Sequence, residues 1–219
     1  RLTKLEQFFI ANAPITSEQY FVDVDEESPY YDEQESWSWA NFEYLMDVEI
    51  YNCPNLNKLP LEFITGLPKL QSLNVAMNYG ISGEQLKSDW EAIIDGDSGD
   101  DIQILYLSFN NLKETPSHDY LKRMTRISYL DCTTNKLEIV HSFGKEISPA
   151  TIMFDYNNIH TITVEDGDYY CGMSMLETFS CSNNRLTKLP DLFSARSIYT
   201  MLTADFSSNE ISELENGDQ

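Results

Sequence analysis

The side chains best suited to catalysis are three histidines, and their spacing does not favour it. His118, His141 and His160 form no HExxH pair, and no Ser, His and Asp set has the spacing of a catalytic triad. The sequence also contains no Gly-rich phosphate loop and no GxSxG segment. We therefore predict ordinary surface histidines, no catalytic residue and no cofactor.

Four cysteines could bind a metal or form disulfides. Cys53, Cys132, Cys171 and Cys181 include no CxxC pair, so zinc is not expected. Cys53, Cys132 and Cys181 occupy positions of a sequence repeat where a small apolar side chain is buried, which predicts buried free thiols. Cys132 and Cys181 lie two repeats apart, beyond the ~7 Å between Cα atoms that a disulfide allows. Pairing of Cys171 with Cys181 stays open.

Two acidic, Gly-containing segments resemble places where calcium could bind. They are DGDSGDD at 95–101 and EDGD at 165–168. Neither fits the D-x-[DN]-x-[DN]-G calcium loop, so we predict acidic turns and no metal site.

The charge of the chain restricts its partners. The 219 residues contain 14 Lys and Arg against 36 Asp and Glu, a net charge of −22. This balance argues against nucleic acid and against anionic lipid. No apolar run reaches the ~20 residues of a membrane span, so we predict no membrane insertion. A basic protein or an uncharged glycan is a partner compatible with this charge. The charge can also serve only to keep the surface soluble.

Apolar residues recur at a fixed spacing along the whole chain. Residues 102–112, IQILYLSFNNL, read LxxLxLxxNxL, the spacing of a leucine-rich repeat. Alternation around Leu105 and Leu107 gives a strand one face of which is apolar. Eight such units follow one another, with strands predicted near 6–11, 46–51, 71–76, 103–108, 128–133, 150–155, 177–182 and 202–207.

An asparagine recurs after most of the predicted strands. Its amide can bond backbone groups of neighbouring coils, so we predict a structural ladder of Asn78, Asn110, Asn135, Asn157, Asn184 and Asn209. Ala13 and Cys53 replace it in the first two repeats. One repeat cannot bury its own apolar edge, so the units must stack.

The expected fold is therefore a single α/β solenoid over residues 1–219: an open right-handed horseshoe with a concave parallel sheet and short helices and loops outside. The first repeat also reads as a helix capped by Thr3 and Glu6, and we favour the strand. Residues 16–44 form an acidic insertion with a short helix near 37–42, and convex helices are expected at 82–95 and 118–126. In the helix expected at 82–95, Ser82 and Gln85 form a capping box at the N-terminus. Leu86, Trp90 and Ile93 share one face of this helix, which is expected to be buried.

Strand positions that flank the buried residues point to the concave side. The middle of this surface is richer in aromatic and apolar side chains than solubility requires. We call it the concave patch: Ile104, Tyr106, Tyr129, Asp131, Met153 and Asp155. Tyrosines beside carboxylates suit a protein loop bearing Lys or Arg, or a sugar ring, although tyrosine neighbours can also simply shield a sheet.

Segments such as DVEIYNCPNLNKLP, LDCTTNKL and FSCSNNRLTKLP resemble leucine-rich-repeat proteins of Bacteroides-type gut bacteria. The resemblance implies a secreted or surface lipoprotein, hence an extracellular or outer-membrane location, and a recognition role rather than an enzymatic one. Because no capping repeat is evident at either end, we expect the chain to be a segment of a longer protein. The predicted function is protein recognition through the concave patch. The alternatives are a glycan-binding accessory to polysaccharide uptake and a rigid spacer.

Overall fold

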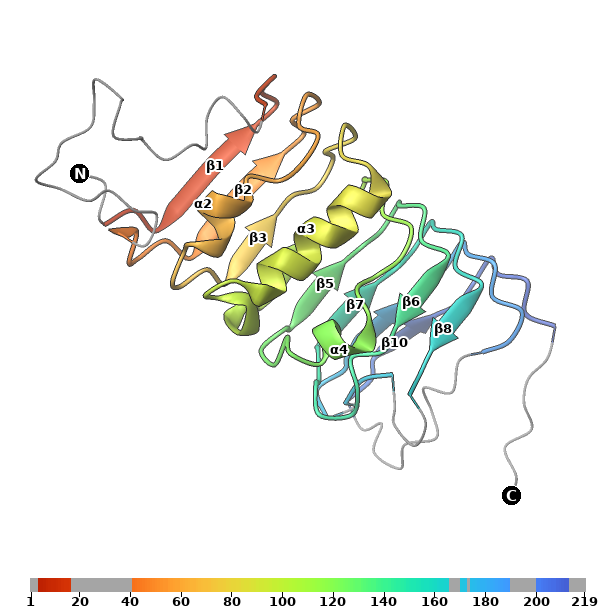
Figure 1. The fold of residues 1–219 in the computed structure, drawn as a ribbon. Helices are drawn as coiled ribbons and strands as arrows, with labels where there is room; N and C mark the ends of the chain where they lie inside the picture. Colours follow the sequence, from red (N-terminus) through yellow and green to blue (C-terminus); the bar gives the residue numbers. More distant parts are fainter. Residues whose placement is uncertain (1–3, 17–40, 166–169, 173, 190–199, 213–219) are drawn as a thin grey trace, which may run out of the picture.

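The fold is built on a parallel sheet whose strands follow one another along the chain. The computed structural model describes residues 4–16, 41–165, 170–172, 174–189 and 200–212. Its eight-stranded sheet has the order β1-β2-β3-β4-β5-β7-β9-β10 (Figure 1). The strands are β1 Gln7–Ala11, β2 Asp47–Tyr51, β3 Ser72–Asn74, β4 Ile104–Tyr106, β5 Tyr129–Asp131, β7 Thr151–Met153, β9 Thr178–Ser180 and β10 Thr203–Asp205.

The pairing register confirms the repeat alignment. Each strand contributes one residue to a row that crosses the sheet, and the first row reads Gln7, Asp47, Ser72, Ile104, Tyr129, Thr151, Thr178 and Thr203. Because strand side chains alternate between faces, a shared register places equivalent repeat positions on one face. The eight-repeat solenoid expected from the spacing is confirmed.

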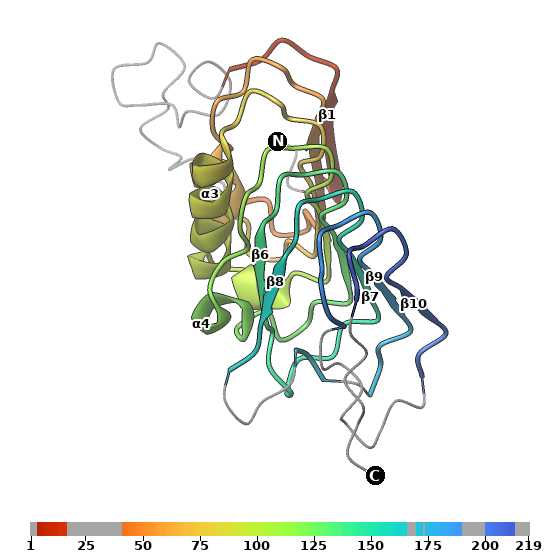
Figure 2. The ribbon, with the colours of Figure 1, turned by 90° about the vertical axis from the view of Figure 1, so that its right-hand side faces the viewer.

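The opposite side of the solenoid carries the helices and a second sheet. The elements are α2 Leu61–Thr65, α3 Gly83–Asp95, the 3-10 helix η2 Gly99–Asp101, α4 His118–Leu121, and the paired strands β6 Ile139–His141 and β8 Thr161–Thr163. Figure 2 shows α3, α4, β6 and β8 on one side and β1, β9 and β10 on the other. We call these sides the convex and the concave face.

The apolar core fills the space between the two faces. Its central row, one residue per strand, includes Val48, Leu73, Leu130 and Ile152, all with none of their surface exposed. On the convex side Leu86, Trp90 and Ile93 of α3 are buried, as their spacing predicted. Burial of side chains this size stabilises the fold by roughly 1.5–3 kcal/mol each.

Helix α3 begins close against the neighbouring coil. The Ser82 hydroxyl accepts a hydrogen bond from the Gln85 N–H at 3.2 Å, which is half of the predicted capping box. The Gln85 side chain does not complete the box, because it donates to the buried carboxylate of Asp89 at 2.7 Å. A Cβ atom at Gly83 would lie 2.3 Å from the Asn111 carbonyl oxygen, so only glycine allows this approach.

Several boundaries differ from those expected. Most strands span three residues rather than the six expected. The α4 helix ends at Leu121 rather than near 126, and the convex strands β6 and β8 and helix α2 were not predicted. The first repeat is a strand, as favoured. Most of the acidic insertion, including the start of its expected helix, lies outside the described residues.

The recurring asparagines form hydrogen bonds between successive coils. The Oδ1 atom of Asn135 accepts a hydrogen bond of 2.9 Å from the Leu112 N–H of the preceding coil. Its Nδ2 atom donates to the Leu107 carbonyl of that coil at 2.9 Å and to its own Cys132 carbonyl at 3.0 Å. The same set of bonds recurs at Asn78, Asn110, Asn157, Asn184 and Asn209. These amides satisfy backbone groups that leave the sheet at the turn.

The residue before each ladder position has a left-handed backbone. We call these residues the turn row: Asn12, Asn52, Met77, Phe109, Thr134, Tyr156, Asn183 and Ser208, with φ between 52° and 62°. This geometry turns the N–H of Phe109 toward the Thr133 carbonyl of the next coil at 2.9 Å, and that of Tyr156 toward Ser182 at 3.0 Å. The turn row thus joins successive coils just beyond the ends of the strands.

Candidate functional site

The concave patch is a contiguous surface over β4, β5 and β7. The rings of Tyr106 and Tyr129 have centroids 5.1 Å apart and are tilted by 46°. The Tyr129 hydroxyl lies 3.4 Å from the Met153 sulfur, within hydrogen-bonding range for sulfur. Ile104 pairs in register with Tyr129 across the two strands. All four side chains are half-buried, so they pack on one another and still present a surface to solvent.

The carboxylates of the patch differ in their surroundings. Asp131 is half-buried, and its Oδ1 atom accepts a hydrogen bond from the Thr133 N–H at 2.8 Å. This bond fixes the side chain beside the Tyr106 and Tyr129 rings and leaves a second oxygen for a ligand. Burial raises the pKa of Tyr129, and the Asp131 charge adds to that shift. Tyr129 is therefore a neutral hydrogen-bond donor at neutral pH.

Asp155 does not belong to the exposed surface, and its prediction as a ligand-binding residue is corrected here. Only 8% of the residue is exposed. Its Oδ1 atom accepts hydrogen bonds from the Ser180 hydroxyl at 2.6 Å and from the Ser182 N–H at 2.7 Å. The carboxylate therefore joins two coils and is already occupied.

The concave face carries charges of one sign, which is negative. The three outward positions of each repeat contain no Lys, Arg or His. They contain five carboxylates, the half-buried ones of Asp47, Glu49, Asp131 and Asp205 and the buried one of Asp155. Within the described ranges none of the five forms an ion pair. Several of the ion pairs that do form link the convex helices to neighbouring coils, as between Lys113 and Glu84 at 2.7 Å. The concave face is therefore an uncompensated acidic surface.

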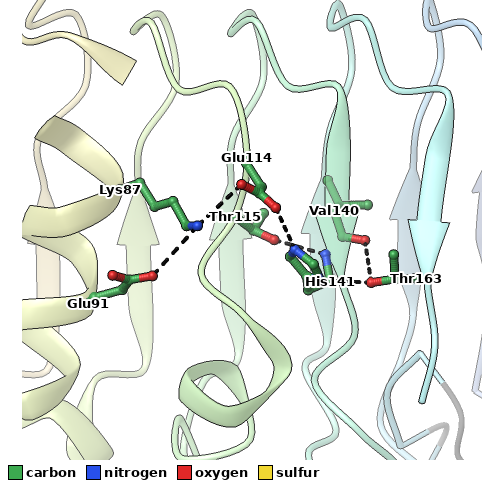
Figure 3. Close-up of polar contacts among 7 residues, drawn as sticks. All are labelled: Lys87, Glu91, Glu114, Thr115, Val140, His141 and Thr163. Carbon is green, nitrogen blue, oxygen red and sulfur yellow. Dashed lines mark hydrogen bonds and ion pairs between the residues drawn. The ribbon is translucent and has the colours of Figure 1, made fainter. Parts of the chain in front are cut away.

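The convex face carries a polar cluster that the sequence did not reveal. Figure 3 shows Glu114 between Lys87 of α3 and His141 of β6, at 3.2 Å and 2.8 Å. The other ring nitrogen of His141 lies 2.8 Å from the Thr163 hydroxyl of β8. The hydrogen bond with His141 is the main reason why the pKa of Glu114 lies below its ordinary value. His141 is thus half-buried and bonded, not an ordinary surface histidine as predicted.

No sequence pattern predicts this cluster, because its members come from four separate coils of the solenoid. Lys87 also lies 3.9 Å from Glu91, one helical turn further along α3 (Figure 3). The cluster ties α3 to the second sheet. We interpret it as structural, since each of its polar groups has a partner in the chain.

All four cysteines are free and buried, as predicted for Cys53 and Cys132, and the open question of a Cys171–Cys181 disulfide is answered by two free thiols. Burial raises the pKa of Cys171 and of Cys181 to about 12. Burial also raises the pKa of Cys132. Such thiols remain protonated and are poor nucleophiles.

The described residues contain no group of three or more His, Cys, Asp or Glu side chains that could hold a metal ion. None of the described helices combines the length and the apolar character needed to cross a membrane. The EDGD segment lies mostly outside the described residues, whereas 95–101 forms the end of α3, a turn and η2.

The stacked coils, the in-register sheet and the asparagine ladder define a leucine-rich-repeat solenoid. Residues 175–195 match the Leucine Rich Repeat family model. The chain is 42% identical to a leucine-rich repeat protein from Bacteroides eggerthii DSM 20697, with a TM-score of 0.83 over 96% of this chain. It is 41% identical to one from Bacteroides thetaiotaomicron VPI-5482, with a TM-score of 0.82 over the same share.

The chain therefore has the leucine-rich-repeat fold and is similar in sequence to these two Bacteroides proteins. It spans 34% of the length of the first of these two proteins and 25% of the second. No curated protein is significantly similar to it.

Proposed function

We propose that this solenoid is a non-enzymatic recognition module that binds a protein partner through the concave patch without Asp155. The observation that carries the proposal is the packed set of Tyr106, Tyr129 and Met153 beside Asp131. Tyrosine rings offer large, nearly rigid contact surfaces, and they are enriched among the residues that dominate binding energy. The surrounding acidic surface favours a basic partner and disfavours nucleic acid.

Sugar binding is the second candidate. Tyr106 and Tyr129 lie side by side, and Asp131 has an oxygen available next to them. A pyranose ring could stack on one ring and donate a hydroxyl hydrogen bond to the carboxylate. The resemblance to Bacteroides proteins supports both candidates equally, and an exported location is proposed on that resemblance alone.

The proposal is tested by screening the full chain against a panel of glycans and of gut bacterial and host proteins. The variant Tyr106→Ala/Tyr129→Ala/Asp131→Asn removes both rings and one charge. Asparagine at position 131 keeps the Oδ1 acceptor for the Thr133 N–H, so the turn after β5 is retained. Tyr44→Ala serves as the matched control, because Tyr44 is 50% exposed and lies outside the concave face.

We expect a protein ligand whose affinity falls at least tenfold in the triple variant and stays unchanged in Tyr44→Ala. A glycan ligand with the same pattern would establish the second candidate. Equal binding by a folded triple variant would refute the patch assignment, and absence of any ligand would favour a rigid spacer.

A further inference from the structure

The turn row contains bulky side chains where the backbone disfavours them. Asparagine and serine occupy it in the first two and the last two repeats, at Asn12, Asn52, Asn183 and Ser208. The four central repeats instead place Met77, Phe109, Thr134 and Tyr156 there, at φ values of 55° to 62°. Asparagine tolerates this region of backbone space, whereas bulky and β-branched residues are rare in it.

The left-handed backbone gains a hydrogen bond to the next coil, but Asn12, Asn52 and Asn183 gain the same bond, so the bulky side chains add strain without adding a bond. A left-handed backbone is unfavourable for an ordinary side chain, because Cβ comes too close to the following carbonyl oxygen. Phe109 remains 44% exposed and Tyr156 remains 60% exposed. Within the described part of the chain neither ring packs against another aromatic ring. Strained residues that gain little from their own fold are commonly found where a ligand makes contact.

The two rings flank the concave patch. Phe109 follows Tyr106 by three residues at the end of β4, and Tyr156 follows Met153 by three residues at the end of β7. Thr134 stands between them in the same row, after Asp131 of β5. The strands are parallel and in register, so the rings lie along the one edge where the strands end. An exposed apolar edge thus borders an acidic, tyrosine-lined face.

We propose that the partner is a protein segment that lies across this edge. Its apolar side chains would contact Phe109 and Tyr156, and its Lys or Arg side chains would reach the Tyr106, Tyr129 and Asp131 surface. The charge of the concave face supports this choice, because its outward positions carry carboxylates and no Lys, Arg or His. A Lys or Arg side chain at this surface can make a cation–π interaction with a tyrosine ring and a charge-assisted hydrogen bond with the carboxylate. This inference rests on the proposed function and specifies its partner.

The turn row itself supplies a variant that should remain folded. Phe109→Asn/Tyr156→Asn installs the residue that Asn12, Asn52 and Asn183 already have in this conformation. The backbone hydrogen bonds to the next coil do not involve these side chains and are kept. The variant should therefore melt at a higher temperature than the wild type while losing contact with the partner. Loss of binding then cannot be ascribed to unfolding.

The matched control is Met175→Asn. Met175 is 60% exposed, as Tyr156 is, but it precedes β9 and so lies at the opposite edge of the sheet. Its backbone is not left-handed, so neither the melting temperature nor binding should change.

The probe is a phage-displayed library of random twelve-residue peptides, selected on the full wild-type chain. We expect enriched peptides to combine Lys or Arg with apolar residues. Their affinity should fall at least tenfold in Phe109→Asn/Tyr156→Asn and in Tyr106→Ala/Tyr129→Ala, and remain unchanged in Met175→Asn. The ¹³C-methyl signals of Met77 and Met153 should both shift on binding, since they report on the edge and on the concave face.

Other results would overturn the inference. One contrary result is a set of peptides that bind Phe109→Asn/Tyr156→Asn as tightly as the wild type but bind Tyr106→Ala/Tyr129→Ala only weakly. That result would refute the edge contact and would still support the concave site. Peptides insensitive to both variants, or a selection without binders, would refute the edge contact and the concave site together. Enrichment of acidic or purely polar peptides would refute the stated partner chemistry.

Discussion

The carboxylate of Asp155 accepts a 2.6 Å hydrogen bond from the hydroxyl of Ser180 on the next strand. The same oxygen accepts the Ser182 N–H at 2.7 Å, so one acceptor serves two donors of the seventh coil. Asp131, one coil earlier, bonds only the N–H of its own turn within the part of the chain described here. Two aspartates in similar sequence surroundings therefore have different roles.

Replacing Asp155 should weaken the fold rather than ligand binding. Asp155→Ala leaves the Ser180 hydroxyl and the Ser182 N–H buried without an acceptor, at a cost of about 2–3 kcal/mol in the free energy of unfolding. Asp155→Asn keeps Oδ1 and should cost less. Urea unfolding measures both. An alanine variant as stable as the wild type would show that water satisfies these groups.

The asparagine ladder should be individually important for stability. Asn135→Ala removes the acceptor of the Leu112 N–H and the donor to two carbonyls, all of them buried. The Leu107 and Cys132 carbonyls still accept hydrogen bonds from the amides of Asn110 and Asn157, so the Leu112 N–H is the group left without a partner. We expect a loss of about 1–3 kcal/mol in the free energy of unfolding, the cost of one such buried group. Asn135→Asp keeps the Oδ1 acceptor and loses the Nδ2 donor. Its unfolding midpoint should therefore also lie below that of the wild type. A change under half a kcal/mol in the alanine variant would contradict the structural role of the ladder.

The turn row allows a paired exchange between two coils. Thr134 is β-branched and Asn183 is not, yet both have φ near 55°. Thr134→Asn should raise the melting temperature by about 2–4 °C, as expected for about 1 kcal/mol in a chain of this size. Asn183→Thr should lower it by a similar amount. Thermal unfolding followed by circular dichroism tests the pair, and shifts of the same sign would disprove the backbone explanation.

The convex cluster should give a pH-dependent contribution to stability. The folded-state pKa of Glu114 is lowered from 4.5, mainly by the hydrogen bond with His141, with Lys87 adding to the shift. A lowered folded pKa means that the stabilisation is present above pH 4.5 and is lost as the pH falls through the folded value. Because the Glu114 side chain is 37% exposed, the gain should stay below about 1 kcal/mol.

The variant Glu114→Gln tests this contribution. Its deficit in unfolding free energy relative to the wild type should be largest near pH 7 and should shrink below pH 4.5, as measured by urea titrations at several pH values. A deficit that stays the same between neutral pH and pH values well below 4.5 would contradict a contribution from the Glu114 charge.

The four cysteines should be inert in the native protein. At pH 8 a thiol with a pKa of about 12, the value for Cys171 and Cys181, is ionised to about one part in ten thousand. Cys53 and Cys132 are equally buried. We expect an aromatic disulfide reagent to label none of the four thiols in buffer and all four in denaturant. Rapid labelling of one thiol in buffer would show local opening of its coil.

The amino-acid sequence by itself determined the solenoid, its eight coils and the residues of the asparagine ladder. Those features follow from a short repeat in which each apolar position must be buried against the same position of a neighbour, so periodicity alone fixes the register. The positions of Tyr106, Tyr129 and Met153 on one face follow from the same alternation.

Contacts between side chains of different coils were decided only by the tertiary structure. Asp155 is buried because Ser180 and Ser182 of the next coil lie within reach of its carboxylate, and no spacing within one repeat reveals this. The pairing of Glu114 with His141 depends in the same way on connectors of unequal length. The left-handed backbone of Phe109 and Tyr156 could not be predicted from the sequence. Repeat spacing specifies where a residue lies in the coil and not the conformation that its backbone adopts.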